Sequence, residues 1–192
     1  MPFPLSLGQR RPCALAVLTL LSCISLASMA QAVSFNTQQQ QQHQDWESLV
    51  VSLGQEQHIR AVERSSYTDA MLSINATPGR CTRHWLEMRS GLGEQQAVSG
   101  QVNEVPADVL VDENPAMTGR VALSTERGDD GLYLRFHDID MPLLEAQMST
   151  GQQLHLRIRM SESLDDYWFM TFSLNGASEA LSRIRKLCQS SR

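Results

Sequence analysis

Two features are missing from the sequence beyond residue 32: a long hydrophobic run and a recognisable catalytic motif. No later stretch approaches the ~18 apolar residues of a transmembrane helix, so we expect no membrane span in the mature chain. The sequence contains no HExxH, GxSxG, SxxK, Walker or GxGxxG segment, the common signatures of zinc hydrolases, serine hydrolases and nucleotide-binding proteins. The sequence therefore predicts a protein without a cofactor and without an enzymatic site.

Positive charge is also scarce. The chain holds 16 Lys and Arg against 21 Asp and Glu, and Lys186 is its single lysine. Two of the arginines lie in the first 32 residues, so the remaining 160 residues carry 14 cations against 21 acids, a net charge of −7. Nucleic acids and anionic lipids bind to basic surfaces, so we expect neither as a partner. Nothing in the composition indicates the oligomeric state.

Cysteine is limited to four residues, and two of them, Cys13 and Cys23, lie in the first 32 residues. The remaining pair, Cys81 and Cys188, is predicted to form one disulfide in an exported protein. Closing so long a loop stabilises a fold by about 4–5 kcal/mol in the chain-entropy model. The alternative is a free catalytic cysteine, which no flanking residue supports, and the spacing excludes a CxxC redox site or a zinc-binding cysteine cluster.

What the sequence does contain is an export signal at its start. Arg10 and Arg11 precede an apolar run over residues 14–27, which is followed by the small-x-small segment Ala30-Gln31-Ala32. This order is typical of a cleaved signal peptide over residues 1–32. We therefore expect a periplasmic location, where cysteines are oxidised.

Two alternatives to simple cleavage remain at this segment. Leu20-Leu21-Ser22-Cys23 loosely matches a lipobox, which would leave Cys23 as a lipidated N-terminus. Against this alternative, Leu21 stands where a smaller residue is usual, and the apolar run continues past Cys23. The second alternative is an anchor that is never cleaved.

Three segments divide the chain in this interpretation: the signal over residues 1–32, a disordered linker over 33–44 and a single β-rich domain over 45–192. The linker assignment rests on the polar, low-complexity sequence VSFNTQQQQQHQ, which cannot bury apolar surface. Residues 45–53 fit helical and strand patterns almost equally, and we favour the helix. Residues 59–62 are undecided, and the Gly- and Pro-containing segment 90–117 is expected to be mostly loop.

Alternation of apolar and polar residues predicts strands at 70–74, 81–88, 108–112, 121–125, 132–136, 154–160 and 167–174. The strand over 167–174 is apolar on both faces at its start, which predicts a central position in the sheet. Trp46, Trp85 and Trp168 are expected in the core. One exposed tryptophan would instead indicate an interface.

The last element is predicted to be an amphipathic helix. Its apolar positions recur with helical spacing: Ala177, Ala180, Leu181, Ile184, Leu187 and Cys188. Because Cys188 lies on this stripe, the disulfide would hold the helix on the sheet. The fold class is therefore α+β: an antiparallel sheet, or a β-sandwich, with a C-terminal helix packed on it and one disulfide.

The C-terminal part of the sequence resembles a known family. The features that carry the resemblance are Cys81, strands that bear arginines, Phe172-Ser-Leu174-Asn-Gly176, Ala180-Leu181, Ile184-Arg185 and Cys188. Over residues 71–188 this pattern looks like the periplasmic proteins associated with type VI secretion (the TagO or VasI group). Unlike that group, residues 33–80 contain no cysteine. The resemblance implies a related exported fold and a role as a secretion-system accessory, and it supplies no catalytic residue.

Arg135, Arg157 and Arg159 are the candidate binding residues. All three are predicted to project from the sheet face opposite the core, where they would hold an anionic ligand or an acidic edge of a partner. A solvated face with ion pairs is the alternative.

A metal site is the second candidate. His137 and Asp138 are adjacent in sequence, and His155 would join them if the two histidine-bearing strands paired. The alternative is that they are ordinary polar residues of an exposed sheet, because no HxH or HExxH spacing supports a ligand set.

The sequence thus favours a non-enzymatic periplasmic protein that binds a partner protein or an envelope component. A small metal-dependent hydrolase that uses His137, Asp138 and His155 is the alternative. A domain that caps or inhibits another secreted protein is a third possibility.

Overall fold

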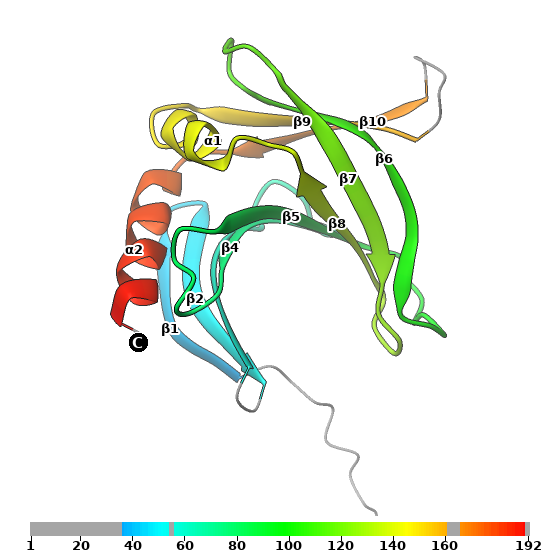
Figure 1. Ribbon diagram of the computed structural model, residues 1–192, viewed down its shortest axis with the longest axis horizontal. Helices are drawn as coiled ribbons and strands as arrows, with labels where there is room; N and C mark the ends of the chain where they lie inside the picture. The colour runs from blue at the N-terminus through cyan, green and yellow to red at the C-terminus, as the bar shows by residue number, and fades with distance from the viewer. Residues whose placement is uncertain (1–35, 54–55, 161–165, 191–192) are drawn as a thin grey trace, which may run out of the picture. The chain divides into compact units, whose positions relative to one another are not determined.

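The structure, a computed structural model, describes residues 36–53, 56–160 and 166–190 (Figure 1). By its contacts the chain divides into two units, residues 1–34 and 35–192, and every described element belongs to the second. The strands are β1 (Asn36–His43), β2 (Trp46–Leu53), β3 (Glu56–Glu63), β4 (Ala70–Ala76), β5 (His84–Gly91), β6 (Gly100–Val111), β7 (Met117–Thr125), β8 (Gly131–His137), β9 (Gln153–Arg159) and β10 (Tyr167–Ser173). The helices are α1 (Met141–Met148) and α2 (Ala177–Ser190).

The ten described strands form one sheet in the order β1-β2-β3-β4-β5-β8-β7-β6-β9-β10. Every neighbouring pair of named strands is antiparallel. Two pairings join strands that are not consecutive in sequence, β5 with β8 and β6 with β9. The hairpin of β6 and β7 therefore lies between β8 and β9. This confirms the predicted α+β class with a mostly antiparallel sheet. Within the described residues, neither helix is long and apolar enough to cross a membrane.

The main core lies on one face of the sheet, where apolar residues occupy alternate positions of the strands as predicted. On β9, Leu154, Leu156 and Ile158 are fully buried. Each apolar side chain of this size contributes roughly 1.5–3 kcal/mol when it leaves water. Trp46 on β2 and Phe172 on β10 are the largest fully buried side chains. The indole Nε1 of Trp46 donates to the carbonyl of Ser173 at 2.8 Å, which joins the start of β2 to the end of β10.

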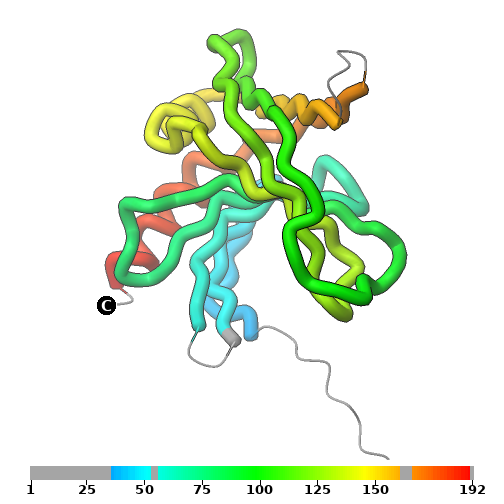
Figure 2. Tube along the Cα trace, turned by 45° about the vertical axis from the view of Figure 1, so that its right-hand side comes forward, coloured from blue at the N-terminus to red at the C-terminus, as the bar shows by residue number. Residues whose placement is uncertain are grey.

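Helix α2 covers this core, and it contacts β2 and β3 most extensively. All six residues of the predicted stripe are buried, from Ala177 to Cys188. Cys188 forms a disulfide with Cys81, with their Cα atoms 5.6 Å apart. Cys81 lies in the connection between β4 and β5, and Figure 2 shows the end of α2 beside this connection. The predicted disulfide and the packed C-terminal helix are therefore confirmed.

A buried polar contact adds a second tie to this region. His84 at the start of β5 and Glu145 on α1 form a hydrogen bond between Nδ1 and Oε1 at 2.5 Å, and both side chains are nearly buried. Arg185 on α2 donates to the other carboxylate oxygen of Glu145 at 3.1 Å. One carboxylate thus joins β5, α1 and α2.

Two predictions near the N-terminus were wrong. Residues 36–43, assigned to a disordered linker, form β1, so the β-rich domain begins before residue 45. β1 has no alternation because its side chains are exposed, and it is held by its backbone ladder with β2. Residues 46–53 form β2 rather than a helix. Val50 on β2 packs in the main core, while Leu49 and Val51 pack in a small cluster on the other face. Because both faces are buried, the sequence of β2 does not alternate between apolar and polar residues.

Two further predictions about strands need correction. The segment 90–117 contains the twelve-residue strand β6, although it was expected to be mostly loop. Pro106 and a register shift between Gln101 and Asn103 interrupt its pattern. β10 was predicted to be central, but it is the terminal strand of the sheet.

Candidate functional site

The antiparallel register of β9 and β10 gathers arginine and aromatic side chains on one face. Arg157 lies opposite Phe169, and Arg159 lies opposite Tyr167. Directly opposed residues in a sheet project to the same side. Because Leu156 and Ile158 point into the core, these four side chains lie on the outer face, as predicted for the arginines.

Asp108 on β6 holds both arginines in place. It lies in register with Arg157, whose guanidinium approaches its carboxylate at 2.7 Å, and Arg159 approaches at 3.4 Å. Thr118 on β7 donates to the same carboxylate at 2.8 Å. Burial raises the pKa of Asp108, but the hydrogen bonds from Thr118 and Arg157 and the charges of both arginines outweigh it, so the pKa is lowered. Asp108 is therefore an anion at neutral pH.

The charges of this cluster do not cancel. Two guanidinium groups share one carboxylate, and the side chain of Arg157 remains 52% exposed. The Nε of Arg159 is buried and finds no hydrogen-bond partner among the described residues. Counting the described residues alone, the cluster carries about one excess positive charge, on a chain whose net charge is −5.

The aromatic side chains beside this cluster are exposed. Tyr167, Trp168 and Phe169 are 47%, 37% and 58% exposed. Trp168 lies opposite Ile158 and so belongs to the core-side face, while Tyr167 and Phe169 belong to the outer face. The prediction that Trp168 lies in the core was therefore wrong, whereas Trp46 is fully buried.

We call the outer-face residues Arg157, Arg159, Tyr167 and Phe169 together the β9–β10 surface. Tyrosine, tryptophan and arginine are the side chains that dominate binding energy at protein interfaces, and hot spots concentrate in them.

His155 borders this surface. Its ring stacks on Phe169, with centroids 5.7 Å apart and an interplanar angle of 20°. Its Nδ1 lies 2.9 Å from the hydroxyl of Thr171 on β10. The contact with Thr171 orients the His155 ring, and the stacking contact in turn limits the orientation of the Phe169 ring.

Arg135 lies apart from the other two predicted arginines. It projects from β8 and its guanidinium covers the ring of Trp85 on β5, 4.6 Å from the centroid. Strands β7 and β6 separate β8 from β9. The predicted face of three arginines is therefore two separate groups.

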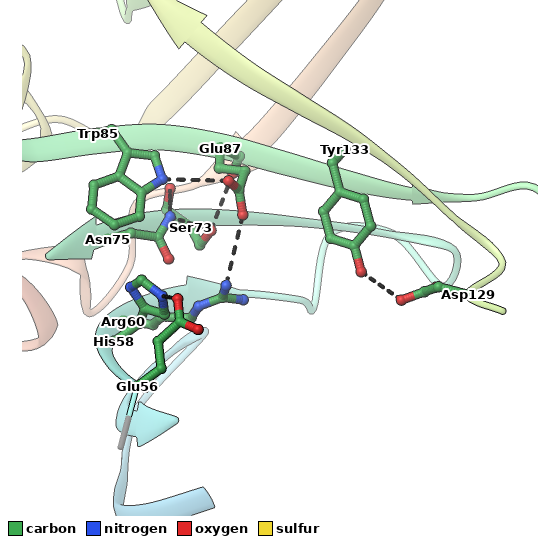
Figure 3. Close-up of polar contacts among 9 residues, drawn as sticks. All are labelled: Glu56, His58, Arg60, Ser73, Asn75, Trp85, Glu87, Asp129 and Tyr133. Carbon is green, nitrogen blue, oxygen red and sulfur yellow. Dashed lines mark hydrogen bonds and ion pairs between the residues drawn. The ribbon is translucent and has the colours of Figure 1, made fainter. Parts of the chain in front are cut away.

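The group around Trp85 is a polar network over β3, β4 and β5 (Figure 3). The indole of Trp85 donates to Glu87 at 3.3 Å, and Glu87 lies 3.8 Å from the guanidinium of Arg60. Asn75 is fully buried beneath these side chains and donates to Ser73 at 2.9 Å. Trp85, Glu87 and Arg60 thus link β5 to β3 through polar contacts on this face.

The predicted metal ligands do not meet. His137 ends β8, where it lies opposite Arg120, and His155 lies on β9 between β6 and β10. The two histidine-bearing strands do not pair, which was the condition for the site. Within the described part of the chain, no group of three or more His, Cys, Asp and Glu side chains lies close enough to hold a metal ion. The structure therefore does not bring the two histidines together on paired strands.

The turn between β7 and β8 contains a cluster that sequence patterns did not reveal. Asp129 accepts hydrogen bonds from Arg89 at 2.6 Å and from the hydroxyl of Tyr133 at 2.6 Å. Burial raises the pKa of Asp129, but these two hydrogen bonds and one from the backbone of Gly131 lower it to about 2. The carboxylate therefore ties this turn to β5 and is not available as a general base.

The comparisons with known proteins concern the fold. No family model matches the chain, and no curated protein matches it. Among solved structures, the chain is similar to the crystal structure of invasion associated protein B from Bartonella henselae, with a TM-score of 0.53 and 13% identity. The match covers 80% of this chain and 99% of that chain. At this identity the likeness supports the architecture alone, and it does not bear on the resemblance to type VI secretion proteins, which stays a prediction.

Proposed function

We propose that the protein is exported and acts without catalysis, by binding a partner protein through the β9–β10 surface. The observation that carries the proposal is the run of three exposed aromatic side chains, Tyr167, Trp168 and Phe169, on the terminal strand. Exposed apolar surface of this kind on an end strand invites association, so it needs a partner or a covering element.

The opposite end of the same sheet supports this interpretation. β1 is polar throughout, and its ladder with β2 is interrupted between Gln38 and Gln41, with Gln39 at a φ of 53°. Polar side chains and such irregularities protect an edge from unwanted pairing. β10 shows no register shift with β9 and carries aromatic residues. β1 is thus protected along its edge, whereas the part of β10 that carries Tyr167 and Phe169 lacks these features.

Export is supported by the sequence signal and is compatible with the Cys81–Cys188 disulfide, because such bonds persist in oxidising compartments. The residues of the signal, including Cys23, lie outside the described residues. A secretion-system accessory role would be one form of partner binding, and it rests on the sequence resemblance. No observation favours the alternative of a metal-dependent hydrolase.

The test is capture of partner proteins from an envelope extract with three forms of the mature protein: wild type, Phe169→Ala and Leu143→Ala. Leu143 on α1 is the matched control, because it is 46% exposed and lies outside the β9–β10 surface. We expect one dominant protein that the wild type and Leu143→Ala retain and Phe169→Ala loses. Removal of an interface hot spot costs at least about 2 kcal/mol, roughly a thirtyfold loss of affinity. Equal capture by all three forms would contradict the proposal.

A further inference from the structure

Along the edge of β10 that faces away from β9, the backbone groups of one half are hydrogen-bonded to described residues and those of the other half are not. In an antiparallel ladder, alternate residues direct both N–H and C=O to the same side. Thr171 and Ser173 direct theirs away from β9, since their N–H groups donate to the hydroxyls of Tyr67 and Ser66, at 2.9 and 3.0 Å. By the same alternation, Phe169 and Tyr167 also direct their backbone groups away from β9.

The other half of this edge lacks such hydrogen bonds within the described residues. Among residues 36–53, 56–160 and 166–190, no group bonds to the outward backbone of Tyr167 or Phe169. The connection between β3 and β4, which supplies Ser66 and Tyr67, reaches only as far as Thr171. The side chains of Tyr167 and Phe169 are also the exposed members of the outer face. Free ladder groups and exposed aromatic side chains therefore coincide at the same two residues.

The charge beside this edge selects the partner. Arg157 and Arg159 share Asp108, and the Nε of Arg159 lacks a partner within the described residues, so the site attracts a carboxylate. A second copy of this chain is a poor occupant, because pairing of two β10 edges would bring the excess positive charge of both copies together. An acidic segment of a different protein has the complementary charge.

The geometry points to β-strand addition: an extended, acidic segment of a partner protein pairs with Tyr167 and Phe169 on the free edge of β10. This inference rests on the proposed function and names its binding mode and partner chemistry. Main-chain hydrogen bonds provide affinity in this mode, and the side chains of alternate residues provide specificity. One face of the segment packs on Phe169 and Tyr167, and a carboxylate on the same face pairs with Arg157.

The probes are short synthetic peptides that carry leucine and glutamate in turn on one strand face and threonine on the other, measured by fluorescence anisotropy against the mature protein. Two matched peptides replace glutamate by lysine or methylate the backbone nitrogens of alternate residues. We expect binding of the acidic peptide alone, and weaker binding as ionic strength rises from about 0.05 M to about 0.5 M. Amide hydrogen exchange at Tyr167 and Phe169 should slow in the complex.

Matched variants separate the charge from the fold. Arg157→Gln should weaken binding of the acidic peptide by about tenfold, as expected for loss of a close charge pair. Arg120→Gln is the control, because Arg120 is an exposed, ion-paired arginine on β7. It should leave the affinity unchanged, and circular dichroism should show both variants folded.

Three results would overturn the inference: equal binding of the acidic and basic peptides, undiminished binding of the N-methylated peptide, or a wild-type dimer that Phe169→Ala converts to a monomer. If envelope capture still depends on Phe169 while the peptides behave in the first or second way, the binding mode is wrong and the proposed function stands. If capture does not depend on Phe169, both fail.

Discussion

Replacing Cys188 by serine should cost the protein a large part of its stability. The disulfide with Cys81 spans a sequence separation of 107, and for a closed loop of that size the chain-entropy model gives about 4.8 kcal/mol. This figure is an upper value, because residual structure in the unfolded chain reduces the entropy that the bond removes. For a domain of this size, 1 kcal/mol shifts the thermal midpoint by about 2–4 °C, so the expected drop is at most about 10–19 °C.

The structure also indicates where the loss appears. Cys188 lies in the last turns of α2, and the buried residues Ala177 to Ile184 still hold the earlier turns on the sheet. We therefore expect the end of α2 to fray first, with faster amide exchange after Leu187. The core strands should exchange as before until global unfolding.

Thermal unfolding followed by circular dichroism measures this effect, in the presence and absence of a reductant. Cys81→Ser, Cys188→Ser and the double variant should melt at the same temperature, because each removes the same bond. The wild type with reductant should match them. If the oxidised wild type and Cys188→Ser melted together, or if both thiols of exported protein reacted freely, the reasoning would be refuted.

Three further outcomes are expected. Because the pKa of Asp129 is lowered to about 2, its carboxylate stabilises the fold above pH ~4, and this contribution disappears as the pH falls toward 2. Screening at this partly exposed site limits the contribution to about 1 kcal/mol. Asp129→Asn should lower the free energy of unfolding by that amount in denaturant titrations at pH 7. Gly176→Ala should destabilise by about 1–3 kcal/mol, because Gly176 has a φ of 92° and an added Cβ would collide with the carbonyl of His43. Elemental analysis should find no stoichiometric metal in purified protein, and His137→Ala should leave the metal content unchanged.

Periodicity predicted the elements whose two faces differ. The strand over residues 154–160 and the helix that ends near Cys188 were identifiable because each has one buried and one exposed face. The same logic failed for β1, which has no buried face, and for β2, which is buried on both. Burial of this kind is set by neighbouring strands, which local sequence does not specify.

Only part of the candidate site could be predicted from the sequence. Arg157 and Arg159 were identified because they alternate with buried residues, but their partner Asp108 depends on the pairing of β6 with β9, strands far apart in the chain. Trp168 was expected in the core and its strand in the centre of the sheet, because hydrophobicity alone does not distinguish a central strand from an exposed terminal one. Arg135 and His137 were placed wrongly relative to β9, since the hairpin of β6 and β7 lies between the strands that carry them.

The most direct test of the β9–β10 surface is photocrosslinking in living cells, with a photoreactive amino acid at position 169 or, as the control, at position 143. Both side chains are exposed, at 58% and 46%, so exposure alone does not favour either. We expect a defined crosslinked complex with one partner protein from position 169 and none from position 143. A lack of crosslinks at position 169, or the same products from both positions, would contradict the account.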